Sequence, residues 1–506
     1  MSTALAIALV TSACGGSGSP ANDAPAEITV ASFGEYPTVD ASFAFAATRG
    51  QVQRQVMEPL LDRDGKDPSV LVPVLATSWT RVDPQTLRFQ LRQNVKFQDG
   101  SDFNAEVAAF AINRLFAKEN NFGIRQVMGP QITANVVDDH TVDVVTAGAD
   151  PILEQRMTSA LIQSKQQFDT GGQAAWEQKS IGTGPYVMDS WERGRQFILT
   201  KNNDWWAGAD KLKIDKVIWL QRPDDESRLA AVQSGEAQLA DRLAVDSCLQ
   251  ALDDRCISAP SNAFSFLRPD QTSSPVLKDA RIREAIALAI DKDTIAKQLY
   301  ANAPVSPTII ADYMVGYPHG LAPYPFDPAK AVELVNQAAA DGVPTSTPIR
   351  IVAEPTRLRS IQNLTDIIRD ALKVLPLNIT VEIEDQQAFL KEFLGTPPEG
   401  RSLITLHEHA NQVFDASGTY GSYARCGGPN SAFCDPAIDE DAKTAAAAGG
   451  SERDTAYQAV MTKLYDAYAW IPLFQTELRH GVGENLQWTP RADGFFYVKD
   501  MGLASM

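Results

Sequence analysis

The sequence predicts a mixed α/β protein built from two or three lobes. A chain of 506 residues exceeds the size at which a single hydrophobic core keeps growing, so several lobes are expected. Strand-like alternation and helix-like periodicity follow one another along the chain, with no internal repeat and no coiled-coil heptad. With 44% hydrophobic and 21% charged residues, the composition is that of a globular protein.

Short alternating segments predict the first strands. Residues 27–32 (EITVAS) and 86–91 (TLRFQL) alternate apolar and polar side chains, as strands with one buried face do. Residues 95–97 (VKF) predict a further short strand. Asp99 and Gly100 then predict a turn, because glycine adopts the positive φ that such turns require.

Two segments have the spacing of amphipathic helices. Asn104 is a good N-cap, and the apolar side chains that follow it fall on one helical face. That face consists of Val107, Phe110, Ala111 and Leu115. A second helix is predicted from Arg281. Its buried face consists of Ile282, Ala285, Ile286, Ala289 and Ile290.

Charge and motif content argue against several classes of function. The formal net charge of −18, from 45 Lys and Arg against 63 Asp and Glu, argues against nucleic acid as a partner. No run of 18 or more apolar residues is present, so no segment of the mature chain is expected to span a bilayer. The chain has no G-x-S-x-G, Walker lysine or dinucleotide motif, and we expect neither catalysis nor a cofactor. In residues 181–186 (IGTGPY), Pro185 interrupts the backbone donors that a phosphate loop needs, which favours a tight chain reversal between lobes.

The N-terminus has features of an exported lipoprotein. Cys14 follows a short apolar run and three small residues, an arrangement that resembles a lipobox, so residues 1–14 are interpreted as a lipoprotein signal peptide. Residues 15–26 have the composition of a flexible linker. No Lys or Arg precedes the apolar run and Thr11 stands where a lipobox usually has Leu, so an ordinary cleaved signal or a truncated start remains an alternative.

The other four cysteines fall into two close pairs, as an oxidising compartment favours. We expect Cys248 to pair with Cys256 and Cys426 with Cys434, although three pairings are open to four cysteines. Four buried free thiols are the alternative.

Several sequence blocks resemble one known family. The most specific is Val95 to Gly100 (VKF-x-DG) followed by a helix. The other blocks are 58–63 (EPLLDR), 181–192 (IGTGPYVMDSWE), 202–208 (NNDWWAG), 223–241 (PDDESRLAAVQSGEAQLAD), 277–295 (LKDARIREAIALAIDKDTI), 327–334 (DPAKAVEL) and 469–474 (AWIPLF). In this order and spacing they are similar to the family-5 extracellular solute-binding proteins of ABC importers, the dipeptide, oligopeptide and nickel-binding family.

The resemblance implies a periplasmic-binding-protein-like fold of type II (cluster C). Two lobes would close around a ligand like a hinged trap, and an extra third domain would be inserted in the first lobe. The implied division places domain I at 27–57, 179–275 and 476–506, domain II at 58–178 and domain III at 276–475.

The resemblance also implies the partners. The chain would capture a peptide or similar small solute outside the cytoplasm and deliver it to an ABC permease and ATPase complex. A lipid anchor would hold it at the outer face of the cytoplasmic membrane, or it would be periplasmic. Nothing suggests a self-complementary apolar face, so we expect a monomer. Presentation of the closed form to a receptor, as a sensor of a non-peptide solute, is the alternative.

The segment expected to bind the ligand departs from the pattern of peptide binders. These proteins typically carry Trp-x-x-Asp-Tyr before the second cysteine pair, and the Asp pairs with the peptide's α-ammonium group. Here Glu408 stands for the Trp and Asn411 for the Asp, which removes a charge-assisted bond of about 1.5–3 kcal/mol. Either Asp415 or Glu408 supplies the anion, or the ligand lacks a free ammonium, as nickel chelates and oligosaccharides do, or is another small solute such as glutathione.

His407 and His409 form an H-x-H pair. On a strand both rings project to the same face, a geometry that suits a transition metal. A nickel or zinc site is one interpretation, but the pattern does not identify its flanking ligands, so we assign no metal. Ligand-lining or surface roles are the alternatives.

Further candidate ligand contacts lie in other segments. They are Glu35, Tyr36, Phe264, Phe266, Arg268 and Arg425. Glu35 and Tyr36 follow the first strand, at the strand end where open α/β sheets bind ligands. Arg268, in a stretch expected to cross between the lobes, is suited to a carboxylate. Trp205 and Trp206 could form a ligand wall, although adjacent aromatic side chains are expected to point to different sides.

Overall fold

The computed structural model describes residues 25–34, 36–44, 50–118, 120, 122–129, 131–301, 303–354, 360–395, 398–491 and 493–504. Cys14, the signal segment, most of the 15–26 linker and Glu35 lie outside these residues. The chain has the mixed α/β fold in several parts that the sequence predicts.

A ten-stranded mixed sheet runs through the whole molecule. In spatial order its strands are β10 (Tyr186–Glu192), β11 (Gln196–Lys201), β12 (Lys216–Gln221), β1 (Glu27–Ser32), β13 (Leu239–Ala240), β18 (Ile471–Val482), β14 (Cys256–Pro269), β17 (Leu403–Ala410), β15 (Ile349–Ala353) and β16 (Ile379–Ile383). The parallel pairs β1–β12 and β15–β17 lie in different halves of this sheet.

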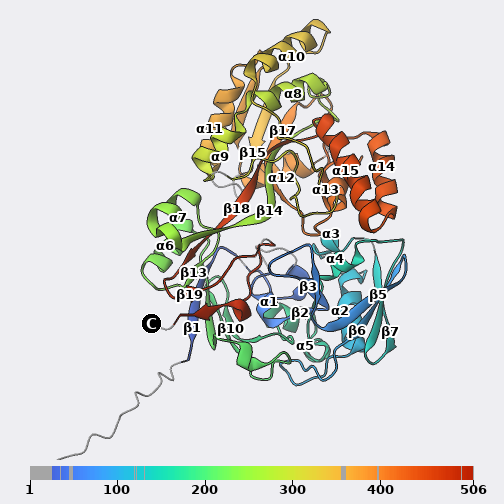
Figure 1. Ribbon diagram of the computed structural model, residues 1–506, viewed down its shortest axis with the longest axis vertical. Coiled ribbons are helices and arrows are strands. Elements are labelled where there is room, and N and C mark those ends of the chain that lie inside the picture. The colour runs from blue at the N-terminus through green and yellow to red at the C-terminus, as the bar shows by residue number, and fades with distance from the viewer. Residues whose placement is uncertain are drawn as a thin grey trace, which may run out of the picture.

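Two long antiparallel strands, β14 and β18, connect the two halves of the molecule (Figure 1). We call residues 25–255 with 483–504 the first half and residues 270–470 the second half. The register of the β14–β18 pair shifts between Pro260 and Phe264. Side chains bond the backbone there instead: Gln475 Nε2 donates to the Ser261 carbonyl at 2.6 Å, and Thr476 Oγ1 donates to the Ala263 carbonyl at 3.1 Å. The connection is therefore irregular at its middle, where a bend costs fewest ladder hydrogen bonds.

The first half contains a second, antiparallel sheet beside the large one. Its strand order is β5 (Ala76–Asp83), β6 (Thr86–Leu91), β8 (Thr141–Thr146) and β7 (Ile132–Asp138). Helices α2 (Ala105–Phe116) and α5 (Lys165–Gln178) lie in the same part of the molecule, with the short helices α1 (Gln53–Val56), α3 (Arg125–Met128) and α4 (Leu153–Met157) (Figure 1). The short pairs β2 (Glu58–Pro59) with β9 (Leu161–Ile162) and β3 (Leu61–Arg63) with β4 (Leu71–Pro73) complete this part. Helices α6 (Asp225–Gln233) and α7 (Val245–Leu252) pack on the large sheet.

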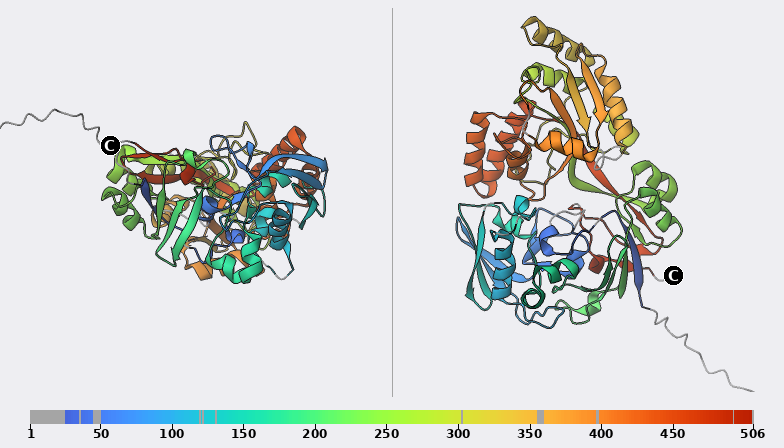
Figure 2. Two further views of the ribbon diagram at one scale, coloured as in Figure 1. Left: turned by 90° about the horizontal axis from the view of Figure 1, so that it is seen from below. Right: turned by 180° about the vertical axis from the view of Figure 1, so that it is seen from behind.

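The second half covers both faces of β15, β16 and β17 with helices. One face packs on α8 (Ala280–Ala289), α9 (Lys292–Leu299), α10 (Pro328–Ala340) and α11 (Ile361–Leu372). The other face packs on α12 (Gln386–Leu394), α13 (Ala416–Tyr423), α14 (Pro436–Ala447) and α15 (Gly450–Asp466). Figure 1 shows α9 and α11 on one side of these strands and α13, α14 and α15 on the other, and the view from behind in Figure 2 agrees.

The C-terminal segment returns to the first half, where β19 (Leu486–Gln487) pairs with β20 (Gly502–Leu503). Two buried glutamines hold it there. Gln51 donates to the Gly494 carbonyl at 2.8 Å and accepts from the Phe496 amide at 3.1 Å. Gln55 donates to the Phe496 carbonyl and accepts from the Val498 amide, both at 2.9 Å. The ring of Phe496 stacks on Trp219 of β12, so the last residues of the chain complete the first core.

Most of the predicted elements are confirmed. The strands at 27–32 and 86–91 have the predicted bounds, and Asn104 caps α2 by accepting from the Val107 amide at 3.1 Å. The buried face predicted for the helix from Arg281 is confirmed in α8 and its C-cap. The strand predicted at 95–97 is wrong. Only an isolated Lys96–Asp102 bridge forms there, because Asp99 Oδ1 accepts from the Ser101 amide and Gly100 has φ of 85°, which closes a tight turn.

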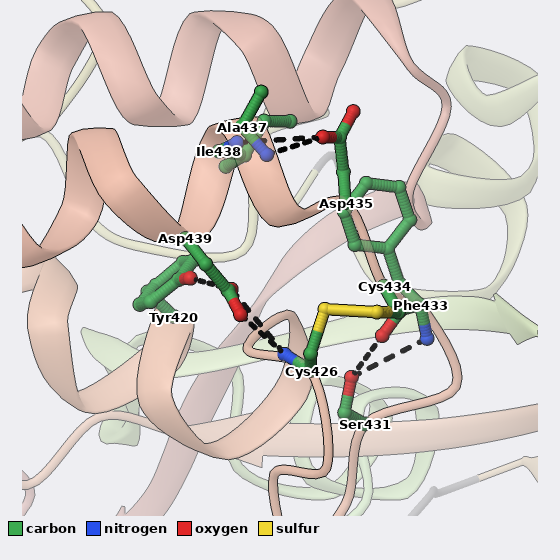
Figure 3. The surroundings of a disulfide bond; sticks show 9 residues. All are labelled: Tyr420, Cys426, Ser431, Phe433, Cys434, Asp435, Ala437, Ile438 and Asp439. Carbon is green, nitrogen blue, oxygen red and sulfur yellow. Dashed lines mark hydrogen bonds between the residues drawn. A yellow bond between two sulfur atoms is a disulfide. The ribbon is translucent and has the colours of Figure 1, made fainter.

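The four described cysteines form the two expected disulfides, Cys248–Cys256 and Cys426–Cys434. The first ties α7 to the start of β14. The second joins the end of α13 to the start of α14, where Asp439 faces both Tyr420 and the backbone amide of Cys426 (Figure 3). Each bond thus fixes a helix to a neighbouring element. Among the described residues, no helix is long and apolar enough to cross a membrane.

Candidate functional site

The loop Asn411–Asp415 follows β17 and lies where the second half meets the first. The amide of Asn411 is 2% exposed and bonded at both ends. Its Oδ1 accepts from the backbone amides of Val413 at 3.1 Å and Phe414 at 3.0 Å. Its Nδ2 donates to the Asp415 carbonyl at 2.8 Å and to Thr419 Oγ1 at 2.9 Å. Asn411 therefore holds the loop in shape.

Asp415, the alternative anion, is also hydrogen-bonded within the protein. Its carboxylate is fully buried and accepts two hydrogen bonds from the guanidinium of Arg453, each 2.8 Å long. Oδ1 also accepts from the Ser417 amide and so caps α13. Burial alone would lower the pKa of Arg453, but the hydrogen bonds that it donates to Asp415 and the negative charge of that carboxylate raise it. The pair is a buried ion pair that anchors the loop to α15.

The 411–415 loop contacts the first half directly. Val413 packs with Val127 of α3 and with Ile152, the N-cap of α4. Arg63 of β3 donates from NH2 to the Val413 carbonyl at 3.2 Å and places its guanidinium 3.8 Å from the ring centre of Phe414. Figure 1 shows α3 and α4 at the edge of the first half that faces α13.

Arg63 is a buried cation at this contact. It is 5% exposed, and its second guanidinium nitrogen donates to the Pro68 carbonyl at 2.9 Å. Burial lowers its pKa to about 10, against the opposing effect of Asp493 and Asp62. The backbone of Arg63 is held in turn by Arg491, which donates to its carbonyl at 3.1 Å.

The histidine pair lies on one face of β17, as predicted for a strand. His407 contacts Glu354 Oε2 through Nδ1 and Tyr423 Oη through Nε2, both at 2.9 Å. His409 contacts Thr419 Oγ1 through Nε2 at 2.8 Å. Both rings are buried, which rules out a surface role. No group of three or more potential metal ligands occurs among the described residues.

Phe264, Phe266 and Arg268 lie on the crossing strand β14, opposite His409, His407 and Thr405 of β17. Phe266 is fully buried among aromatic side chains of the second half. Arg268 donates to Thr405 Oγ1 at 3.1 Å and to the Asn430 carbonyl at 2.5 Å, and lies 4.0 Å from the ring centre of Phe393. Burial lowers its pKa to about 10.

The remaining candidates lie apart from one another. Tyr36, after β1, is buried and packs edge-on against Phe197 at 5.1 Å, in the core of the first half. Glu408 is half-buried and pairs in register with Ser265 on the face of β17 opposite the histidines. Arg425 is exposed beside the Cys426–Cys434 disulfide. The structure thus brings His407, His409, Asn411 and Asp415 together and leaves Tyr36, Glu408 and Arg425 outside that group.

Comparison with known proteins identifies the family. The sequence model of the bacterial extracellular solute-binding proteins, family 5 (middle region), matches residues 70–431, which is well over half of the chain. This chain is a family-5 solute-binding protein. Proteins of this family are the extracytoplasmic, non-enzymatic binding components of ABC transporters.

Curated relatives of this family-5 protein include glutathione-binding proteins. The chain is 28% identical to GsiB of Salmonella typhi over 296 residues, which are 56% of each chain. It is 27% identical to GsiB of Escherichia coli O1:K1 over 323 residues, which are 62% of this chain and 61% of the relative. The matches thus span less than two thirds of the length of these relatives.

Solved structures show the same fold at low identity. The substrate-binding protein CtaP of Listeria monocytogenes is 19% identical with a TM-score of 0.82, covering 95% of this chain and 99% of that one. DppA of Helicobacter pylori, in complex with the peptide STSA, is 20% identical with a TM-score of 0.76, covering 94% and 98%. These likenesses establish the fold.

Three sequence blocks of the family-5 protein converge on one buried carboxylate, Glu58. It accepts from Thr183 Oγ1 at 2.8 Å, from Trp205 Nε1 at 3.2 Å and from Trp206 Nε1 at 2.7 Å. The expectation that the two tryptophans point to different sides is wrong, because both indoles donate to Glu58. Burial raises the pKa of this carboxyl. The cluster is a packing centre of the first half.

The glycines of the 181–186 block pack closely against the backbone of Val56, in the same part of the first half. A Cβ on Gly182 would lie 2.2 Å from the Val56 carbonyl oxygen, and one on Gly184 would lie 2.7 Å from it. Their role is close approach of two backbones, which only glycine permits.

Sequence reasoning missed Arg63. It lies within the 58–63 block, and its charge at the end of that block was the only available signal.

Proposed function

We propose that this family-5 protein captures a peptide or similar small solute between its two halves outside the cytoplasm and delivers it to an ABC permease. The observation that carries the proposal is the connection of the halves by β14 and β18, whose pairing is irregular at 260–264. Such a connection bends at low cost, and a ligand that touches both halves favours the closed arrangement. A permease can then distinguish the occupied form by its shape.

The division into domain I (27–57, 179–275, 476–506), domain II (58–178) and domain III (276–475) is part of this proposal, as is a monomeric state. So is a lipid anchor at Cys14. Replacement of Cys14 by Ser should move the protein from the membrane fraction to the medium or periplasm, and an unchanged membrane fraction would contradict the anchor.

The peptide class is supported by the binding partners of proteins with this fold, such as the peptide STSA and the dipeptide Met-Leu. The relatives named for glutathione extend the class to modified peptides. Candidate contacts remain on the crossing strand β14 (Phe264, Phe266 and Arg268), in the second half (His407, Glu408 and Arg425) and in the first half (Glu35 and Tyr36).

A specific observation favours a second candidate, a solute without a free α-ammonium group. Asn411 carries no charge, and the carboxylate of Asp415 is paired with Arg453 inside the fold. Neither side chain is available to pair with an ammonium group. A non-peptide ligand, such as a nickel chelate or an oligosaccharide, would fit this arrangement, with the closed form presented to a receptor.

A thermal-shift screen of the mature chain tests both candidates, after partial unfolding and dialysis to remove carried-over ligand. The panel contains di- to pentapeptides, their N-acetylated forms, glutathione, nickel with histidine, and short oligosaccharides. A ligand at 100 times its dissociation constant stabilises the fold by about 2.7 kcal/mol. Stabilisation by free and acetylated peptides alike supports a peptide importer without an ammonium anchor at Asn411. If the free peptides stabilise the protein and their acetylated forms do not, an anion at a position other than Asn411 binds the ammonium group. A response to non-peptides alone would overturn the peptide class.

A further inference from the structure

We propose that the 411–415 loop is a latch that holds the two halves together, that Arg63 is its receptor on the first half, and that this contact sets the affinity for ligand. The inference rests on the proposed function for its meaning in binding. Its structural part concerns the ligand-free chain and can be tested alone.

The loop is fixed in one shape before it reaches the first half. Asn411 bonds the amides of the two residues that make the contact, Val413 and Phe414. Phe414 has a φ of 59°, a conformation that non-glycine residues rarely adopt without support. The Asp415–Arg453 pair and a bridge from Val315 to Asp415 fix the far end. A loop held at both ends loses little entropy when it docks.

The loop is also joined to the irregular part of the crossing strands. Asn262, between Pro260 and Phe264, donates from Nδ2 to the Asn411 carbonyl at 2.9 Å. Its own carbonyl accepts from the Asn411 amide at 3.3 Å. A bend at Asn262 therefore moves Asn411 and the loop with it, so that bending of the connection and separation of the latch are one motion.

The contact on the first half has a polar and an apolar part. Arg63 gives one hydrogen bond to the loop and places its guanidinium over the ring of Phe414, in a site where both side chains are at least 94% buried. A desolvated cation over an aromatic ring is more strongly attracted than an exposed one. Val413 fills the space between Val127 and Ile152, all three of them buried. Opening of the halves would expose this apolar surface and leave the Phe414 ring without its cation.

The latch has a direct consequence for binding. If it raises the fraction of molecules in which the halves are together, it lowers the apparent dissociation constant of any ligand that needs both halves. Asn411 then acts as a positioning residue for closure, in the place where peptide binders of this family carry an ammonium-binding carboxylate.

Small-angle X-ray scattering of the ligand-free, full mature chain tests the latch. Arg63→Met keeps the side chain's length and removes its charge and donors. Phe414→Leu keeps an apolar group and removes the ring face. Arg92→Met is the matched control, because Arg92 stacks on Trp206 at 4.4 Å entirely within the first half. We expect a larger radius of gyration for the two latch variants, no change for the control, and a double variant no more open than the single ones. Circular dichroism verifies that each variant is folded.

Wild-type values of the radius of gyration in both folded latch variants would overturn the inference, whatever ligands bind. Ligand binding is measured separately with reduced glutathione and tetra-alanine as probes. A probe that binds the wild type should lose about tenfold in apparent affinity in Arg63→Met and keep it in Arg92→Met. Equal affinity in both variants would contradict the link to binding. Failure of the whole ligand panel would overturn the proposed function and leave the scattering result in force.

Discussion

The amide of Asn411 uses both of its polar ends inside the chain. Two backbone amides donate to its oxygen, and its nitrogen donates to one carbonyl and one hydroxyl. A carboxylate at this position could keep the first pair of bonds but would face the Asp415 carbonyl with no proton to donate. The side-chain nitrogen is therefore needed by the fold around it, and this need is independent of any ligand.

Asn411→Asp should consequently destabilise the protein without producing an ammonium site. The variant buries an uncompensated negative charge and loses a hydrogen bond, and we expect a loss of about 2–4 kcal/mol in the free energy of unfolding at pH 7, measured by urea titration. Thr419→Val, which removes one partner of the same nitrogen, should cost less. Unchanged stability of Asn411→Asp, together with new binding of free-amine peptides only, would contradict this view of the residue.

Lys292 is a second buried side chain with a measurable signature. Its ammonium group, on a side chain 3% exposed, donates to the carbonyls of Ala287, Ile290 and Tyr324 at 2.6, 3.2 and 3.2 Å. Burial lowers its pKa to about 8, against the opposing effect of Asp293 and Asp291. In the unfolded chain the pKa is near its ordinary value of 10.5.

Between about pH 8 and pH 10.5 the unfolded chain therefore binds more protons at Lys292 than the folded one, and stability contributed by this residue rises with pH. We expect the difference in unfolding free energy between wild type and Lys292→Met to shift in favour of the wild type by about 2–3 kcal/mol across this range. Urea titrations at pH 7.5, 8.5 and 9.5 follow the rise. A difference that does not vary with pH would show that the lysine keeps its ordinary pKa.

At the scale of elements, the disulfides fix helices to their neighbours. Each closes a short loop, since the bonded cysteines are eight positions apart in both pairs. Loops of this length confer about 2–3 kcal/mol each in the chain-entropy description. Reduction should therefore lower the melting temperature, and a thermal scan with and without a phosphine reductant measures it. Cys248→Ala with Cys256→Ala should reproduce part of the loss, and an identical melting curve with free thiols present before reduction would contradict the expectation.

Local signals sufficed for most individual elements. Alternation at 27–32 and 86–91 and the cap at Asn104 predicted structures that form there, because those choices depend on neighbours in sequence. The segment 95–97 alternates in the same way but has no strand to pair with, since the turn at Asp99 and Gly100 folds it onto Ser101 and Asp102. Trp205 and Trp206 were also misjudged, because their orientation depends on Glu58, a residue far away in sequence.

The candidate site was predictable as a segment and not as a set of contacts. The family pattern directed attention to residues 407–415, and within this segment the loop 411–415 contacts the first half. The partners of Asn411 and Asp415 depend on the path of the loop into α13 and on Arg453 of α15. Arg63 and Val413 are separated by 350 positions, and no local pattern connects them.

At the scale of the whole molecule, one ten-stranded sheet extends through both halves. Its edge strands are β10 in the first half and β16 in the second. Besides the strands β14 and β18, the loop at 411–415 joins the two halves. The formal charge of −18 adds mutual repulsion between copies.

We therefore expect the mature chain to be monomeric at micromolar concentration, with and without ligand. Light scattering coupled to size-exclusion chromatography measures the mass, for which the calculated mass of the purified chain is the reference. Measurement at low and at high salt separates charge repulsion from the lack of an apolar contact surface. A stable dimer that persists at both salt concentrations would contradict this expectation.

The return of the C-terminal segment to the first core has a consequence for the order of events during synthesis. Gln51 and Gln55 both bond to the backbone of residues 494–498, and the ring of Phe496 stacks on Trp219. The part of the protein that is made first is thus the part that is finished last. A chain whose synthesis stopped before residue 494 would contain every strand and helix of the second half. Its first half would lack the C-terminal segment that contributes Phe496 to the first core.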